Sequence, residues 1–509
     1  MLKGHPKGLI AAALANMGER FGFYTMMAIL VLFLQAKFGL SGTNAGIIYS
    51  VFYFSIYILA FVGGLIADKS RNYKGTILTG LVVMSVGYMM IAFPTKTPVP
   101  NQTLFLIISL VGLFTIAFGN GLFKGNLQAL VGQMYDNPTY GAKRDSGFSL
   151  FYMFINVGAL FSPLVAVGLR NWWLVKNGFQ YNASLPELCH AFINGTITPE
   201  ASERLTLLAN EVSATPVASI ETFVNSYLNV FTTGFHYAFA ASIVAMIISI
   251  LVFVSNKKFF PDPKKKTKAA ADAKDIQMDV KEVKQRLYAL YAVFAVVIFF
   301  WFSFHQNGLT LTFFAKDYTD LSMLKIDLGF IVIQGAEIFQ SINPLFIVFL
   351  TPIIMAIFGW LNAKGMEPST PKKIAIGMFI AALAYFVMAL GSFGLPLKSE
   401  VDAMGGLSDI QRVTPWLLIG TYFILTVAEL FISPLGISFV SKVAPPQYQG
   451  VMQGGWLGAT ALGNQLLFIG AIFYDSVPMW MTWTVFVVAC LISMFTMIFM
   501  LKWLERVAK

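Results

Sequence analysis

Charged residues are scarce in this sequence. Asp, Glu, Lys and Arg together fill 12% of the 509 positions, whereas hydrophobic residues fill 57% and the mean hydropathy is +0.70. A typical soluble domain carries about 25% charged residues, roughly twice this share. The composition therefore argues against a water-soluble fold, and it indicates that most of the surface faces lipid.

Cysteine and histidine are also rare. Cys189 falls in a predicted external loop and Cys490 in the last apolar run, so they are poor disulfide candidates and too few for a metal site. The four histidines lie on distant segments, and neither HExxH nor GxSxG occurs. We therefore predict that the protein is not an enzyme and needs no cofactor.

Long apolar runs are abundant instead. A bilayer core needs about 20 apolar residues per helix, and we find twelve runs of about this size or longer. They cover residues 9–35, 45–67, 76–93, 104–131, 147–169, 235–254, 287–314, 331–361, 374–393, 416–440, 450–473 and 479–503. We therefore predict an all-α membrane protein with twelve transmembrane helices.

The basic residues indicate an orientation. The net charge of +10 could suggest a nucleic-acid partner. With the amino terminus placed inside, however, most Lys and Arg residues fall in segments on the cytoplasmic side, as the positive-inside rule requires. We therefore expect a multi-pass protein of the cell (inner) membrane with both termini in the cytoplasm, and we expect no nucleic-acid partner.

Two long connections organise the predicted spans. The Lys-rich segment 257–286 separates a six-helix bundle in residues 1–256 from a second in residues 287–509, and a solvated cytoplasmic linker explains it most simply. The external loop 171–232 includes apolar spacing suited to short amphipathic helices within 201–231. A six-plus-six division is typical of transporters that hold their substrate between two bundles near mid-membrane.

A few ionisable residues interrupt the apolar runs. Each ionised group at bilayer depth costs about 2.5 kcal/mol or more, so it needs a local partner or a function. These residues are Glu19, Arg20, Lys124, His305, Glu337 and Glu429. Glu337 lies near the outer end of the eighth run, so reaching the membrane interface would be a sufficient explanation for it.

The signs of these charges suggest a ligand class. Glu19, Arg20 and Lys124 of the first bundle sum to about +1, whereas Glu429 of the second bundle has no basic residue in its own span. A zwitterion between the bundles would satisfy both poles. A purely structural set of ion pairs is the alternative, because Glu19 could neutralise Lys124 without any ligand.

Uncharged polar and aromatic residues add to this picture. Asn156 and Asn343 lie within apolar runs, where they could hold the backbone of a peptide or, alternatively, bond one helix to another. Aromatic residues also occupy plausible cavity faces, although each could serve packing alone. These are Tyr24, Tyr57, Trp301, Phe304 and Trp456.

Several segments resemble motifs of one family. Residues 19–24 (ERFGFY) are similar to its first-span signature, and residues 63–69 (GGLIADK) to the inner-loop motif of its superfamily. Residues 147–158 (GFSLFYMFINVG) closely resemble its fifth-span signature, and residues 339–346 (FQSINPLF) and 429–436 (ELFISPLG) match the second half. The sequence thus resembles the proton-dependent oligopeptide transporters of the major facilitator superfamily over essentially its whole length.

This resemblance implies roles for individual residues. It implies that Arg20 and Lys124 bind the carboxylate of a di- or tripeptide, and that Asn156, Asn343 and Glu429 bind its amine and backbone. The mechanism it implies is proton-driven import by alternating access. The implied pocket also includes Tyr24, Tyr57, Trp301, Ser433 and Trp456.

The sequence also departs from the family pattern, as an atypical bacterial-type member would. Asn16 replaces the first Glu of the ExxER motif, and Met27 replaces a second basic residue. His305 and Gln306 stand where the family commonly has Glu and Gln, and segment 257–286 leaves no room for the two extra helices of typical bacterial members. These changes bear on the proton path more than on peptide recognition.

Three hypotheses for transport therefore stay open. In the first, peptide uptake is proton-coupled, with Glu19 and His305 as the titrating groups, because an unperturbed His titrates at about pH 6.5. In the second, His305 only forms hydrogen bonds and the protein is an uncoupled peptide facilitator. In the third, it moves nitrate or another small anion, although such a site does not call for Glu429. We expect a monomer whose partners are the peptide and the lipid bilayer.

Overall fold

The computed structural model describes residues 4–135, 139–140, 143–261, 279–445 and 448–507. Within these ranges, twelve helices are long and apolar enough to cross a membrane. The prediction of an all-α, multi-pass membrane protein is confirmed. Residues 262–278, the centre of the predicted linker, lie outside the described ranges.

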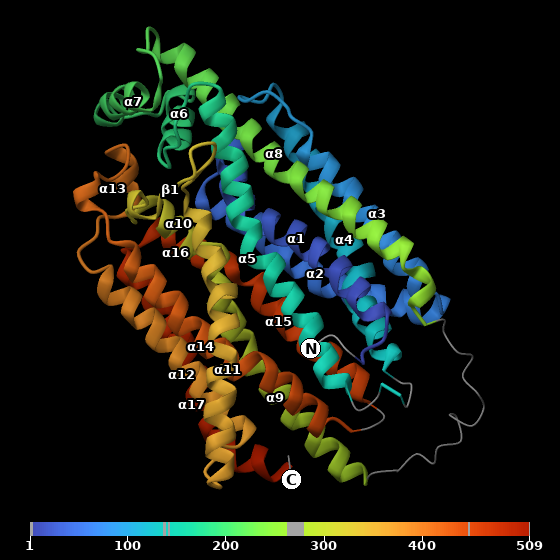
Figure 1. Ribbon diagram of the computed structural model, residues 1–509. Helices are drawn as coiled ribbons and strands as arrows, with labels where there is room; N and C mark the ends of the chain where they lie inside the picture. Colours follow the sequence, from blue (N-terminus) through green and yellow to red (C-terminus); the bar gives the residue numbers. More distant parts are fainter. Residues whose placement is uncertain (1–3, 136–138, 141–142, 262–278, 446–447, 508–509) are drawn as a thin grey trace.

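The first six spans form one bundle (Figure 1). Helix α1 packs against α5 and α8, and α4 packs against α2 and α3. The six helices are α1 (Gly8–Phe38), α2 (Gly42–Ser70), α3 (Tyr73–Ala92), α4 (Gln102–Met134), α5 (Arg144–Lys176) and α8 (Ile220–Ser255).

Glycines allow α4 to approach its neighbours closely. A Cβ at Gly63 of α2 would lie 2.1 Å from the carbonyl oxygen of Gly121, and one at Gly80 of α3 would lie 2.7 Å from that of Gly119. Small residues at such crossings let two backbones come together in lipid, where helix association depends on packing. The glycines of α4 therefore hold this part of the bundle together.

The last six spans form the second bundle, in which two spans are interrupted. The seventh span consists of α9 (Val280–Phe304), the 3₁₀ turn η4 (His305–Gly308) and α10 (Thr310–Asp317), and the eleventh consists of α15 (Gln449–Gln465) and α16 (Leu467–Ser476). The other four are α11 (Ile342–Ala363), α12 (Thr370–Gly391), α14 (Pro415–Val443) and α17 (Met479–Val507).

The start of the eighth apolar run is not helical, so this part of the prediction is wrong. Strands β1 (Ile326–Asp327) and β2 (Val332–Ile333) form an antiparallel hairpin, followed by the 3₁₀ helix η6 (Ala336–Ser341). Gly329 has a φ of +81° in the turn, and its N–H donates to Asp327 Oδ1 at 2.9 Å. The left-handed glycine favours a turn over a continuous helix.

Short helices cover one end of the molecule. The loop that the sequence analysis predicts to be external forms α6 (Leu185–Ile193) and α7 (Pro199–Val212), and α8 begins well before the predicted residue 235. Helix α7 contacts α13 (Lys398–Ala403) of the second bundle. In Figure 1, α6, α7 and α13 lie at the end of the molecule opposite the beginning of α1 and the end of α17.

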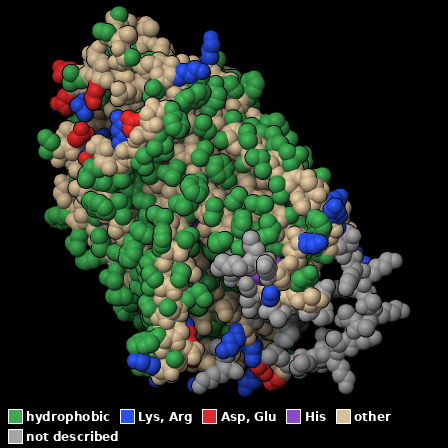
Figure 2. Space-filling model, viewed as in Figure 1, with side chains coloured by type: hydrophobic (Ala, Val, Ile, Leu, Met, Phe, Trp, Pro, Cys, Tyr) green, Lys and Arg blue, Asp and Glu red, His purple; other side chains and the backbone are tan. Residues whose placement is uncertain are grey.

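The surface between the two ends is suited to lipid. Figure 2 shows mainly hydrophobic side chains over the middle of the visible face, with Lys, Arg, Asp and Glu gathered toward the two ends. Phe114, Phe349 and Phe499 are examples of large side chains that stay exposed on this protein. Exposed apolar surface of this extent is what a bilayer core solvates.

Candidate functional site

Glu19 and Arg20 are both buried on α1 and bind each other. Arg20 Nε donates to Glu19 Oε2 at 2.5 Å, and Arg20 Nη2 donates to Glu19 Oε1 at 2.7 Å. Asn120 Nδ2 of α4 donates to the same Oε1 at 2.7 Å. Glu19 thus forms its ion pair with Arg20, and the described residues show no ion pair between Glu19 and Lys124.

Lys124 of α4 is the cation of this group for which the described residues provide no ion pair. Its Nζ lies 4.4 Å from the centre of the Tyr57 ring, a cation–π contact. Among the described residues, no carboxylate oxygen forms an ion pair with this ammonium group. Lys124 is near enough to Arg20 and Glu19 to interact with them electrostatically. The first bundle thus presents a positive charge with no ionic partner in the described chain.

Glu429 of α14 forms the opposite pole. Its Oε2 accepts a hydrogen bond from Asn343 Nδ2 at 2.9 Å, and the same amide donates to Thr426 Oγ1 at 3.0 Å. Glu429 also acts electrostatically on Tyr24 and Tyr57, which belong to the other bundle. The carboxylate therefore faces the space between the bundles and not lipid, and the described residues supply it with no cation.

Asn156 lies beside an aromatic residue that sequence reasoning missed. Its Nδ2 donates only to the carbonyl oxygen of Tyr152 on its own helix, at 3.1 Å, so the described contacts include no bond to another helix. The Tyr152 side chain is 53% exposed and interacts electrostatically with Glu429 and Tyr24. Tyr152 could have been identified from the sequence, because it lies one turn before Asn156 on the same face of α5.

His305 lies where the two interrupted spans meet. Its ring stacks on Trp301 with centroids 4.8 Å apart, and it lies 4.7 Å from the ring of Tyr53 in the first bundle. Nδ1 is 2.5 Å from Asn464 Oδ1, just before the interruption of the eleventh span. Sequence reasoning missed Tyr53 and Asn464.

The remaining predicted pocket residues differ in exposure and in partners. Trp301 and Phe304 are buried around His305, and Trp456 is 3% exposed and packs against Gly436. Trp301 Nε1 and Ser433 Oγ are buried with no hydrogen-bond partner among the described residues. Orphaned polar atoms of this kind are positions at which a ligand or water would bind. Trp456 serves packing in this structure.

A buried ion pair joins the bundles at the end where α6 lies. Arg170, near the carboxyl end of α5, binds Glu337 Oε1 through Nη1, and both residues are 0% exposed. Arg170 Nη2 also donates to the Gln334 carbonyl at 3.0 Å, and Nε donates to Asn171 Oδ1 at 3.1 Å. The expectation that Glu337 reaches the interface is therefore wrong. Arg170 follows the predicted fifth run by one residue, so its role was missed.

Helix α6 is tied to the second bundle by its own ion pairs. Glu187 binds Lys316 Nζ at 3.2 Å and Lys398 Nζ at 2.9 Å. Burial alone would raise the pKa of Glu187, but these two ammonium groups outweigh it and hold the pKa below its ordinary value. Burial, followed by repulsion from Glu187, raises the pKa of the neighbouring Asp402 to about 7. The two bundles are thus joined by ion pairs at this end of the molecule.

Comparison with known proteins decides the family. A family model described as the POT family matches residues 74–276 and 269–479, which is most of the chain. The chain belongs to the POT family.

Individual POT-family relatives match over nearly their full length. Peptide transporter YePEPT of Yersinia enterocolitica is 28% identical and is aligned over 91% of this chain and 86% of its own. Dipeptide and tripeptide permease B of Xenorhabdus bovienii is 26% identical over 99% of this chain and 96% of its own. These relatives are transporters, in agreement with the absence of an enzyme motif from the sequence.

Solved structures share the fold. A crystal structure of peptide transporter POT in complex with sulfate has a TM-score of 0.72 at 23% identity, covering 100% of this chain and 96% of that one. A POT family transporter in complex with 5-aminolevulinic acid has a TM-score of 0.71 at 20% identity, covering 100% and 98%. The predicted transporter fold of twelve spans in two bundles is confirmed.

Proposed function

We propose that this POT-family protein imports di- and tripeptides across the cell (inner) membrane, with both termini in the cytoplasm. One observation carries the proposal: Lys124 contacts the ring of Tyr57, on which Glu429 of the other bundle also acts electrostatically, and neither Lys124 nor Glu429 has an ionic partner in the described chain. Uncompensated charges in a low-dielectric site favour a ligand that brings both signs. The names of the relatives, peptide transporter and dipeptide and tripeptide permease, support the same substrate class.

The proposed roles follow from the donors and acceptors that remain free. Lys124 binds the peptide carboxylate, assisted by the N–H groups of Arg20 that do not contact Glu19. Glu429 binds the peptide ammonium, while Asn343 already orients the carboxylate of Glu429. Asn156 and the orphaned Ser433 hydroxyl are placed to bind backbone groups. No cofactor takes part in these roles.

The external closure fits alternating access. Arg170–Glu337 and the ion pairs of Glu187 join the two bundles at one end, so this state is closed to the outside. Thr43 adds a further contact, because its N–H and hydroxyl both donate to Asp475 Oδ2 at 2.8 Å. Release of the peptide inward and separation of these external contacts complete the proposed cycle. Both charge poles belong to one chain, which supports a monomer as the functional unit.

Substrate class is tested by competition. We expect unlabelled dialanine to suppress uptake of labelled dialanine into liposomes that contain the purified protein, because both poles of the site are then satisfied. Nitrate carries no ammonium group for Glu429, so it should leave uptake unchanged at the same concentration. Suppression by nitrate and not by dialanine would instead favour an anion transporter.

Proton coupling is a separate proposal, with Glu19 and His305 as the titrating groups. We expect an imposed inward proton gradient to drive dialanine above its external concentration, and His305→Gln to abolish this accumulation while exchange of labelled for unlabelled peptide continues. His236→Gln is the matched control, because His236 bonds the Ile91 carbonyl away from the central site. Equal uptake with and without the gradient would identify an uncoupled facilitator.

A further inference from the structure

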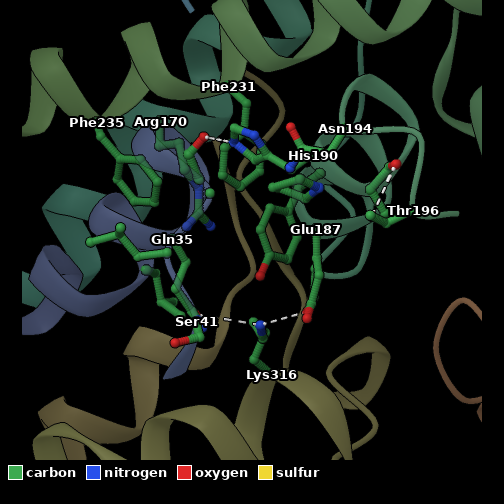
Figure 3. A pocket seen from close by; sticks show the side chains of 18 residues that line it. Gln35, Ser41, Arg170, Glu187, His190, Asn194, Thr196, Phe231, Phe235 and Lys316 are labelled. Atoms are coloured by element: carbon green, nitrogen blue, oxygen red, sulfur yellow. Dashed lines mark hydrogen bonds and ion pairs between the residues drawn. The ribbon is translucent and has the colours of Figure 1, made fainter. Parts of the chain in front are cut away.

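A cavity of about 250 Å³ lies at the external end, apart from the central site (Figure 3). Its walls come from the ends of α1 and α5, from α6 and from α8, and Lys316 of α10 supplies the second bundle's contribution. We call it the outer cavity. The lining residues that bear on its chemistry are Gln35, Arg170, Glu187, Asn194 and Lys316.

The outer cavity lies above the central site along α1. Tyr24, Ala28, Leu32 and Gln35 follow at helical spacing on one face of this helix, so the central site and the cavity share a wall. Tyr24 and Gln35 are about 16 Å apart along the axis at 1.5 Å per residue. Gln340 Nε2 bonds the Ala28 carbonyl at 3.3 Å between them. A molecule moving inward would therefore meet the cavity first.

Not every charge around the outer cavity is available to a ligand. The guanidinium of Arg170 is occupied by Glu337, Asn171 and the Gln334 carbonyl, and it lies 4.2 Å from the centre of the Tyr181 ring. Arg170 is therefore part of the wall.

The exchangeable charges are those of the Glu187–Lys316 contact, which belongs to a larger network, because Lys316 Nζ also lies 3.3 Å from Asp317 Oδ1 and Glu187 Oε1 lies 2.9 Å from Lys398 Nζ. Lys316 Nζ lies between Glu187 Oε2, at 3.2 Å, and Gln35 Oε1, at 3.4 Å (Figure 3). The Glu187 side chain is 43% exposed, whereas that of Lys316 is 8% exposed. The carboxylate can therefore turn toward water, but the ammonium group is fixed in the floor of the cavity.

We propose that the outer cavity is a docking site at which a zwitterionic peptide binds by inserting between Glu187 and Lys316, before it reaches the central site. This rests on the proposed function. The peptide carboxylate takes the place of Glu187 on Lys316, and the peptide ammonium binds Glu187. The Glu187–Lys316 contact is replaced by two contacts with the peptide with no change in net charge, while Glu187 keeps Lys398 and Lys316 keeps Asp317 as partners.

Occupation of the outer cavity would also loosen the external closure. Glu187 is the residue through which α6 reaches both Lys316 and Lys398 of the second bundle. When a peptide separates Glu187 from Lys316, part of this tie is lost while α6 stays bound to α1 through His190 and the Ala36 carbonyl. Loading from outside is thereby linked to opening. The small volume restricts the site to short peptides, because ligand pockets commonly exceed about 300 Å³.

The test measures protection of a cysteine placed at the cavity. Asn194 lines the cavity and is exposed, whereas the native Cys189 and Cys490 are buried, so Asn194→Cys supplies the reactive thiol. Glu429→Gln is added to remove the central site. We expect dialanine to slow alkylation by a small maleimide at least fivefold in this background. Acetylated dialanine, which lacks the ammonium, and dialanine amide, which lacks the carboxylate, should not protect.

Two further variants make the test specific. Glu187→Gln should abolish the protection, whereas Glu211→Gln should leave it unchanged, because Glu211 is an exposed carboxylate of α7 away from the cavity lining. Equal protection in both variants, or protection that disappears with Glu429→Gln alone, would overturn the docking site. The docking site would also be overturned if the wild-type protein takes up dialanine but dialanine does not slow alkylation of the Asn194→Cys variant. Absence of wild-type uptake would refute the proposed function instead.

Discussion

Glu429→Gln should abolish dialanine uptake and remove the thermal stabilisation that dialanine confers on the purified protein. The amide keeps the shape of the side chain and can still contact Asn343, but it leaves the peptide ammonium without a negative partner. Truncating one partner of a buried charge pair costs about 2–5 kcal/mol, so the affinity should fall at least about thirtyfold. Melting temperature against dialanine concentration measures this, because a ligand that binds only the folded state raises it.

The opposite pole and a surface carboxylate provide the controls. Lys124→Ala should lose the dialanine shift as well, since the peptide carboxylate then keeps only the remaining N–H groups of Arg20. Glu282→Gln should retain it, because Glu282 forms an exposed ion pair with Arg286 on α9. An unchanged dialanine affinity in Glu429→Gln would contradict the two-pole site, and the substrate assignment would then depend on similarity to relatives alone.

Arg170→Met should strongly destabilise the folded protein. It removes the cation from the 0%-exposed Glu337 and leaves a carboxylate buried among apolar groups. Breaking a buried ion pair in this way costs about 3–5 kcal/mol. The melting temperature in detergent should fall, and Arg170→Met combined with Glu337→Met should recover most of the loss, because no charge then remains buried. Unfolding temperatures of the single and double variants measure this directly.

A surface pair of the same type is the comparison. Arg286 and Glu282 are separated by 2.9 Å with side chains 19% and 47% exposed, and such pairs contribute about 0–1 kcal/mol. Arg286→Met should therefore change the melting temperature little. If Arg170→Met were equally mild, or if the double variant were no more stable than Arg170→Met, the buried pair would not be what holds this end of the two bundles together.

The charged residues of the central site could be found from sequence for one physical reason. An ionised side chain in an apolar run is costly wherever the run lies in the bundle, so Arg20, Lys124 and Glu429 stand out before any fold is known. The same cost also selects Glu337, whose carboxylate has a structural partner. The free-energy cost of an ionised group in the membrane thus identifies buried charges. It does not distinguish charges that would bind a ligand from charges that already have a partner in the protein.

Local conformation was harder to predict than the spans. The run 331–361 is apolar from end to end, yet its first part forms a hairpin and a 3₁₀ helix, because Gly329 favours a turn and Arg170 and Asn171 bind the carbonyls of Val332 and Gln334. The run 287–314 was likewise predicted as one continuous span, and it is interrupted at His305. There Tyr422 donates to the carbonyl of Asn307 at 2.8 Å, which compensates for helical hydrogen bonds that are lost.

The sequence by itself determined the solvent, the number of spans and the cost of each buried charge, because these follow from the transfer of single residues and short segments from water to lipid. Only the tertiary structure decided which charge pairs with which. Glu19 binds its neighbour Arg20, Glu337 binds Arg170 across the bundles, and Lys124 and Glu429 are left without ionic partners in the described chain. Pairing depends on distances of a few ångströms between helices far apart in sequence, and helix packing alone sets those distances.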